Sequence, residues 1–139
     1  MGKRRKAREF TLQLLFQLDV TNKMSEENSA KPRELFWAHT ACKEEIKSFS
    51  LELIQGTLSH LPEIDEYIKK YAEHWDLSRM PAVDRNILRF AIYEILYRDD
   101  IPLKVSINEA IEIAKIYGTD DSARFINGLL DKVAKTLEA

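Results

Sequence analysis

Five of the first eight residues are basic, and they begin a segment with helical periodicity. These residues are Lys3, Arg4, Arg5, Lys6 and Arg8. At ~100° per residue, Arg5 and Arg8 share one face of a helix over residues 3–20, and Leu12 and Phe16 continue that face. Guanidinium groups pair with phosphates, and an aromatic ring offers a surface on which a base can stack. The pattern predicts a surface for single-stranded nucleic acid.

A second interpretation of this helix stays open. The opposite face has the spacing of a core stripe, made by Ala7, Phe10, Thr11, Leu14 and Leu18. In the alternative, Leu12 and Phe16 also pack beneath another helix and the arginines are merely solvated. The net charge of −2 does not decide between the two. The clustering of positive charge at one end favours nucleic acid.

The sequence contains no catalytic, metal or cofactor motif. His39, His60 and His74 are far apart, without the i,i+4 pairing of a zinc-binding helix. The glycines, at positions 2, 56, 118 and 128, form neither a dinucleotide-binding nor a phosphate-binding loop. Cys42 follows His39 by three residues, which we interpret as a chance neighbour. We expect no enzymatic activity, no cofactor and no metal.

Composition predicts one all-α domain. The 139 residues are 45% hydrophobic and 32% charged, with only four glycines and four prolines for turns. The single cysteine excludes an internal disulfide and is compatible with a reducing cytosol. No run approaches the ~20 apolar residues that span a bilayer, so we expect no membrane association. The periodicity predicts about seven helices and no strand.

Residues 81–97 predict a helix that is buried on most sides. Pro81 suits the first turn, where its missing N–H would have no partner. Apolar residues fill most of the circumference, which places this helix in the middle of the fold. Glu94 then points toward the core, where a carboxylate needs hydrogen-bond donors. We expect Glu94 to cap a neighbouring helix or pair with an arginine, and the less favoured alternative is a catalytic role.

The segments before this helix show weaker signals. Residues 21–31 are polar and predict a loop, and Pro32 predicts the start of a short helix. Residues 43–60 predict a longer helix. Pro62 then begins an amphipathic helix whose apolar face extends to Trp75.

Three signals mark the helices near the C-terminus. Ser106 and Glu109 match the Ser-x-x-Glu capping box, which predicts a helix start at Ser106. Gly118 stands where a glycine C-cap belongs. Gly128 lies within the last helical period and predicts a close approach by another backbone.

Four blocks in order along the chain have a distinctive composition. They are residues 5–9 (RKARE), 84–94 (DRNILRFAIYE), 107–110 (INEA) and 125–131 (FINGLLD). Together, at this spacing, they resemble the NusB family of bacterial transcription antitermination factors. Any one block alone would be a weak signal, but the four cover essentially the whole chain.

The resemblance implies a non-catalytic, cytoplasmic protein made of two small packed helical bundles. Its implied ligand is the boxA segment of ribosomal RNA leaders, bound as single-stranded RNA most tightly together with NusE, a small-subunit ribosomal protein. Other Nus factors and RNA polymerase are implied as indirect partners. The implied RNA-binding residues are Lys3, Arg4, Arg5, Lys6, Arg8, Phe16, Tyr71, Asp121 and Phe125. The implied partner-binding residues are Asp84, Arg89 and, more weakly, Arg85.

The chain also departs from the family pattern. Phe16 lacks the hydroxyl of the tyrosine that relatives can carry there, so stacking remains without a hydrogen bond to RNA. Residues 21–41 do not align with confidence. A ribosomal-RNA methyltransferase with a NusB-like N-terminal domain is the alternative function, and it would need an α/β domain after Ala139. A homodimer that covers the basic helix is a third alternative, which would be a resting form rather than a competing function.

Overall fold

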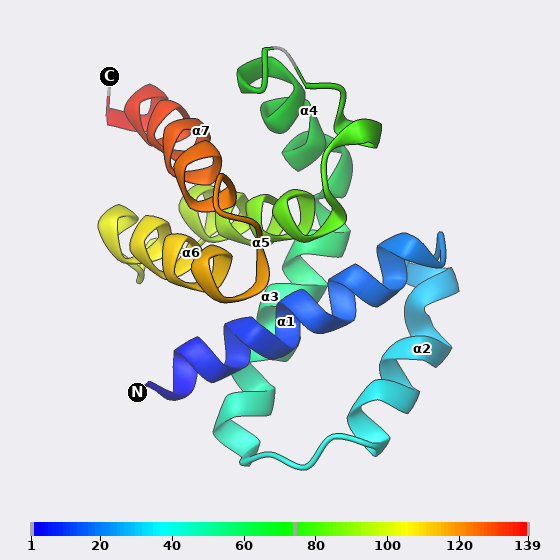
Figure 1. Cartoon of the computed structure of the whole chain (residues 1–139). Helices are drawn as coiled ribbons and strands as arrows, with labels where there is room; N and C mark the ends of the chain where they lie inside the picture. Colours follow the sequence, from blue (N-terminus) through cyan, green and yellow to red (C-terminus); the bar gives the residue numbers. More distant parts are fainter. Residues whose placement is uncertain (1, 74, 139) are drawn as a thin grey trace. The chain divides into compact units, whose positions relative to one another are not determined.

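The computed structural model describes residues 2–73 and 75–138 (Figure 1). Within these residues the chain forms seven α-helices and one 3₁₀ turn, and no strand. The all-α prediction is confirmed. The helices divide into two compact units, the first ending at Ser59 and the second beginning at His60. No helix in the described part is long and apolar enough to cross a membrane.

Three helices form the first unit: α1 (Lys3–Val20), α2 (Glu26–Ala38) and α3 (Glu44–Ser59). Helix α1 packs mainly against α3, and its leucines at 14, 15 and 18 are fully buried. Thr11 of α1 and Ser50 of α3, both fully buried, share a hydrogen bond of 2.8 Å between their hydroxyls. Apolar burial holds these two helices together, and the hydroxyl pair fixes their register.

Helix α2 begins earlier than the sequence predicted. We expected a loop over residues 21–31 and a helix start at Pro32, but Pro32 lies inside α2. The Ser25 side chain accepts a hydrogen bond from the backbone N–H of Asn28 and caps the helix. Glu26 and Glu27 in the first turn also favour the positive end of the helix dipole. These local signals outweigh the helix-breaking effect of the proline.

The second unit contains α4 (Leu61–Tyr71), the 3₁₀ turn η1 (Leu77–Arg79), α5 (Ala82–Tyr97), α6 (Leu103–Tyr117) and α7 (Ser122–Glu138). Helix α5 contacts α4, α6 and α7, which confirms its predicted central position within this unit (Figure 1). Ile87, Leu88 and Phe90 are fully buried. Each such side chain stabilises the fold by ~1.5–3 kcal/mol relative to an exposed one.

Two helix boundaries in this unit differ from prediction. Helix α4 ends at Tyr71, so Trp75 follows the helix and is 53% exposed. Helix α6 begins at Leu103, with Pro102 as its N-cap in an extended conformation. Ser106 therefore lies inside the helix, and the capping-box prediction was wrong. A proline before the first turn starts this helix without a side-chain cap.

Glu94 of α5 and Ser106 of α6 are hydrogen-bonded to each other. The Glu94 carboxylate, 1% exposed, accepts a hydrogen bond of 2.9 Å from the Ser106 hydroxyl in the first turns of α6. The predicted structural role of Glu94 agrees with this contact, although the donor is a serine side chain. A buried carboxylate with a hydrogen-bond donor avoids the desolvation cost of an isolated one.

Gly118 and Gly128 differ in the space that an added Cβ would find. Gly118 does cap α6, but its φ of −98° is not left-handed. A Cβ at this position would lie 2.5 Å from the Ser122 hydroxyl oxygen, so close packing requires the glycine. At Gly128 a Cβ would meet nothing within 4 Å. The predicted approach of another backbone is therefore wrong within this chain.

Candidate nucleic-acid and partner interface

The first two turns of α1 present the most accessible of the predicted cations. Lys3, Arg4 and Lys6 are exposed, and Arg5 is half-buried. Each exposed cation has a weak local contact. Lys3 pairs with Glu45 of α3, Arg4 lies 4.4 Å from the centre of the Phe49 ring, and Lys6 lies 3.9 Å from Glu9. The pair of Lys3 and Glu45, exposed on both sides, contributes only ~0–1 kcal/mol, so a phosphate can replace it at low cost.

Arg8 is placed differently from the other cations of α1. Its side chain is 2% exposed, and the guanidinium carbon lies 5.3 Å from the centre of the Phe49 ring. Leu12 is also buried at 2%, whereas Phe16 is 38% exposed. The predicted stripe is therefore not one exposed surface, because helical spacing alone does not reveal that two of its members pack inward. Arg8 as a phosphate contact stays a prediction, and it is the least accessible of the set.

A pocket in the second unit brings two of the predicted aromatic residues together. Tyr71, at the end of α4, and Phe125, in the first turn of α7, both line it, with Trp75 between them in sequence. The cavity has a volume of about 270 Å³. The Trp75 and Phe125 rings meet edge to face, with centres 6.1 Å apart. Half-exposed rings around a small cavity are suited to stacking against a flat, unpaired base.

Cations border the same pocket. Arg124 and Lys132 of α7 line it, and Lys132 lies 3.7 Å from Glu73. Asp121 is exposed one turn before Phe125, and its carbonyl accepts the Phe125 N–H at 3.1 Å. The predicted RNA contacts thus divide between α1 in the first unit and this pocket in the second. Trp75, Arg124 and Lys132 were missed, although residues 124, 128 and 132 share one helical face.

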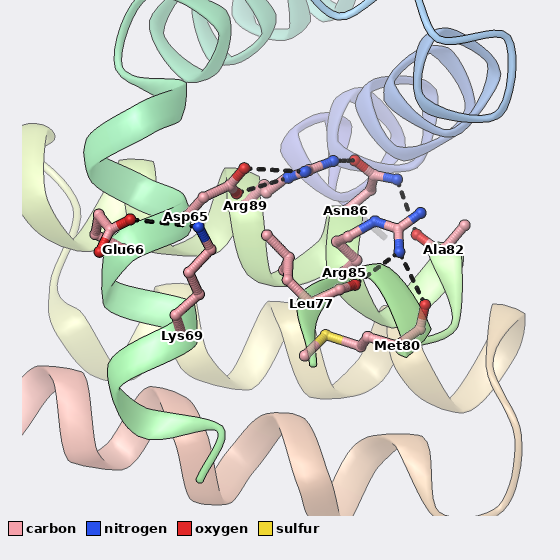
Figure 2. A network of polar contacts seen from close by, with 9 residues as sticks. All are labelled: Asp65, Glu66, Lys69, Leu77, Met80, Ala82, Arg85, Asn86 and Arg89. Carbon is pink, nitrogen blue, oxygen red and sulfur yellow. Dashed lines mark hydrogen bonds and ion pairs between the residues drawn. The ribbon is translucent and has the colours of Figure 1, made fainter. Parts of the chain in front are cut away.

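Figure 2 shows the polar network in which the predicted partner contact Arg89 lies. Arg89 is 6% exposed and binds both carboxylate oxygens of Asp65 on α4, at 2.9 and 3.0 Å. A third guanidinium nitrogen donates to the Asn86 side-chain oxygen at 3.0 Å. Asn86 in turn donates to the Ala82 carbonyl at 2.8 Å. Arg89 therefore joins α5 to α4 within the second unit.

Arg85 closes the turn before α5. One of its guanidinium nitrogens donates to the carbonyls of Leu77 and Met80, each at 2.9 Å (Figure 2). These carbonyls belong to η1 and its C-cap, and the Leu77 carbonyl also accepts the backbone N–H of Met80 at 3.3 Å. The side chain is half-buried, which makes Arg85 more accessible than the other two predicted partner contacts.

Asp84 connects the start of α5 to the start of α7. It is 5% exposed, and its carboxylate accepts a hydrogen bond of 2.7 Å from Ser122. Burial raises the pKa of Asp84, and the hydrogen bond from Ser122 opposes this effect. The same Ser122 oxygen accepts the backbone N–H of Thr119 at 2.9 Å. As with Arg89, the role in partner binding stays a prediction, and the observed contacts are internal.

Within the described residues, no group of three or more histidine, cysteine or acidic side chains is arranged to hold a metal. His60, which carried no prediction, stacks on Tyr97 with ring centres 4.0 Å apart. The chemistry that the two predicted surfaces offer is therefore charge pairing, hydrogen bonding and ring stacking.

Comparison with known proteins decides the family. A sequence profile described as the NusB family matches residues 5–135. The chain belongs to the NusB family. It is 51% identical to the transcription antitermination protein NusB of Thermodesulfovibrio yellowstonii, over 96% of this chain and 92% of that protein. The resemblance inferred from the four blocks is confirmed.

Solved NusB structures share the fold. A crystal form of Thermotoga maritima NusB superposes with a TM-score of 0.83 at 39% identity, covering 95% of this chain and 90% of that one. A chain in the complex of antitermination factors NusB and NusE with double-stranded RNA has a TM-score of 0.82 at 22% identity, with 98% of both chains covered. At that identity the second comparison supports the NusB fold alone.

Proposed function

We propose that this chain is a non-catalytic transcription antitermination factor that binds boxA-type single-stranded RNA together with NusE in the bacterial cytoplasm. Membership of the NusB family over residues 5–135 is the observation that supports this proposal most directly. The other Nus factors and RNA polymerase are then indirect partners, reached through the RNA and NusE.

The two candidate surfaces supply complementary parts of RNA recognition. Lys3, Arg4 and Lys6 provide accessible positive charge for phosphates. Tyr71 and Phe125 line a pocket suited to an unstacked base. Sequence-specific RNA recognition mostly targets unpaired bases in this manner, because the grooves of duplex RNA display little sequence information. We therefore expect single-stranded boxA to bind better than its duplex.

The proposed NusE-binding residues are supported by less direct observations than the RNA-binding residues. Asp84 and Arg89 are buried and hydrogen-bonded within the second unit, so we propose that they support the NusE-binding surface by holding α4, α5 and α7 together. Arg85 is the most accessible of the three and is the proposed direct contact. The solved complex of NusB and NusE with RNA, in which one chain has this fold, supports the choice of partner.

The methyltransferase alternative receives less support. The T. yellowstonii relative is covered over 92% of its length, which leaves no room in that relative for an α/β catalytic domain. The predicted homodimer remains a hypothesis about a resting form. It competes with RNA only if it covers α1.

The deciding experiment is fluorescence anisotropy with labelled boxA-like RNA, its scrambled form and its duplex, with and without NusE. We expect a preference for single-stranded boxA that increases when NusE is added. Replacing Lys3, Arg4 and Lys6 by alanine should weaken binding and flatten its salt dependence by a slope of about 2, at ~0.7 for each phosphate that is no longer neutralised.

The matched control replaces three exposed lysines on helices other than α1, each paired with an acidic neighbour: Lys31, Lys115 and Lys135. It removes the same charge and should leave the salt slope nearly unchanged. Equal binding to all three RNAs, unaffected by NusE, would contradict the proposed function. Equal losses of affinity in the two triple variants would remove α1 as the phosphate-binding element.

A further inference from the structure

Gly128 is a glycine that the fold does not need. It lies inside α7, is exposed, and would have open space around an added Cβ. A glycine within a helix destabilises it by ~1 kcal/mol relative to alanine. Gly118 provides the contrast, because there an added Cβ would collide with Ser122 and with the carbonyl of Ala114. Internal packing explains Gly118 and leaves Gly128 unexplained.

The position of Gly128 points to ligand binding as the reason for a glycine at this position. It lines the aromatic pocket, one turn beyond Phe125 and one turn before Lys132 on the same face of α7. Any side chain at this position would add atoms to the lining of this cavity of about 270 Å³. The missing side chain thus leaves the α7 backbone bare between Phe125 and Lys132.

The pocket has the dimensions and chemistry of a site for one nucleotide. Its volume lies below the ~300–1,000 Å³ typical of drug-sized ligands, so one flat ring fits better than a longer ligand. Trp75, 53% exposed, offers a large aromatic surface next to Phe125. Arg124 and Lys132 in the lining suit a phosphate, which would replace the contact of 3.7 Å between Lys132 and Glu73, the acidic residue of the lining. Cations beside rings favour a nucleotide over an uncharged aromatic side chain of a protein.

We propose that Gly128 is the floor of a pocket that takes one unstacked base of the bound RNA, and that Trp75 is a wall of this pocket on which the base stacks. The inference rests on the proposed function, since it concerns the same RNA. It adds two residues to the RNA-binding set and gives a reason for a glycine at position 128. Selection for this pocket would oppose selection for helix stability at this position.

The test uses Gly128→Ala and Gly128→Leu in the full chain, with Thr136→Ala as the matched control. Thr136 is an exposed, uncharged residue of α7 outside the pocket, and its replacement also raises helix propensity. Gly128→Ala should raise Tm by roughly 3–5 °C. We expect Gly128→Leu to weaken boxA-like RNA binding about tenfold, with a smaller loss for alanine, and Trp75→Ala to weaken it by a similar factor. Thr136→Ala should leave RNA binding unchanged.

RNA with single abasic nucleotides identifies which base enters the pocket. Each boxA nucleotide is replaced in turn by an abasic one, and the position that weakens wild-type binding most is measured again with Gly128→Leu. The two reductions in affinity should not multiply, because both remove the same interaction. Independent reductions at every position would overturn the proposal. So would wild-type affinity in both glycine variants.

Two further outcomes distinguish a failure of this inference from a failure of the proposed function. Intact RNA binding by the glycine variants, alongside weaker binding by the Lys3, Arg4 and Lys6 variant, would refute the pocket and leave the proposed function standing. Absence of any boxA preference in the wild-type protein would remove both. Weaker binding of NusE without RNA in Gly128→Leu would make the pocket a protein site and also overturn the proposal.

Discussion

Two arginines of the second unit make the same fork with an aspartate in different surroundings, and they allow a quantitative prediction. Arg89 binds Asp65 through Nε and a terminal nitrogen at 2.9 and 3.0 Å, with side chains 7% and 17% exposed. Arg98 binds Asp100 through the same atoms at 3.0 Å each, but Asp100 is 55% exposed. The two forks share their donor atoms and nearly the same distances. They differ in the burial of the aspartate, in the chain separation of the partners and in the hydrogen bond that Arg89 also donates to Asn86.

Replacing Arg89 by alanine should cost much more stability than replacing Arg98. Removing one partner of a buried ion pair destabilises a protein by ~3–5 kcal/mol, because the other charge stays buried without compensation. Asp65 retains some solvent contact, so we expect about 3 kcal/mol for Arg89→Ala, including the hydrogen bond that Asn86 would no longer accept. Arg98→Ala should cost at most ~1 kcal/mol, as for an exposed pair.

Urea unfolding followed by circular dichroism measures both changes, and a double-mutant cycle with Asp65→Ala isolates the pair. We expect a coupling energy of about 2 kcal/mol or more between Arg89 and Asp65, so the double variant should be less destabilised than the two single variants predict together. Destabilisations for Arg89→Ala and Arg98→Ala that agree within ~0.5 kcal/mol would refute the reasoning, because burial would then have no effect on identical geometry.

Two further predictions concern groups with raised pKa values. Burial raises the pKa of Asp84, so its contribution to stability is greatest below the ordinary carboxyl pKa and is lost as the pH rises through the folded value. Asp84→Asn can still accept the Ser122 hydrogen bond, so this variant should be more stable than wild type at neutral pH. Urea unfolding at a series of pH values should show this stability difference becoming smaller as the pH falls. A difference that stays constant at all pH values would contradict the prediction. Burial and the hydrogen bond to Glu63 raise the pKa of Tyr97 to about 12. Ultraviolet titration should show a late ionisation step from Tyr97, and Tyr97→Phe should remove that step.

The sequence predicted helices best where apolar spacing was long and uninterrupted. Helix α5 matched its predicted bounds because nearly every side of it is buried, so no alternative pattern competed. The errors occurred at helix ends. Pro32 and the Ser106 capping box were read as start signals, whereas Ser25 and Pro102 begin the helices. Local signals of similar strength lay one or two turns apart, and helix ends are the part of a helix that such signals define least well.

The sequence predicted which residues belong to the candidate site better than it predicted how they are arranged in space. The cluster of cations on α1 is visible in the sequence, but the burial of Arg8 depends on packing that helical spacing cannot reveal. Tyr71 and Phe125 were named through the family resemblance, and their meeting in one pocket required the fold. Trp75 was missed because its spacing continued the apolar face of α4, although the helix ends four residues earlier.

The predicted partner contacts on α5 illustrate the limit most clearly. Asp84, Arg85 and Arg89 were named as partner contacts through the family resemblance. The partners that bury Asp84 and Arg89 lie 38 and 24 residues away, in Ser122 and Asp65. Neither partner is marked by any local motif. A charged residue on a helix can therefore be proposed as a partner contact from sequence, but whether its side chain is exposed or held by internal contacts depends on residues that only the folded chain brings to it.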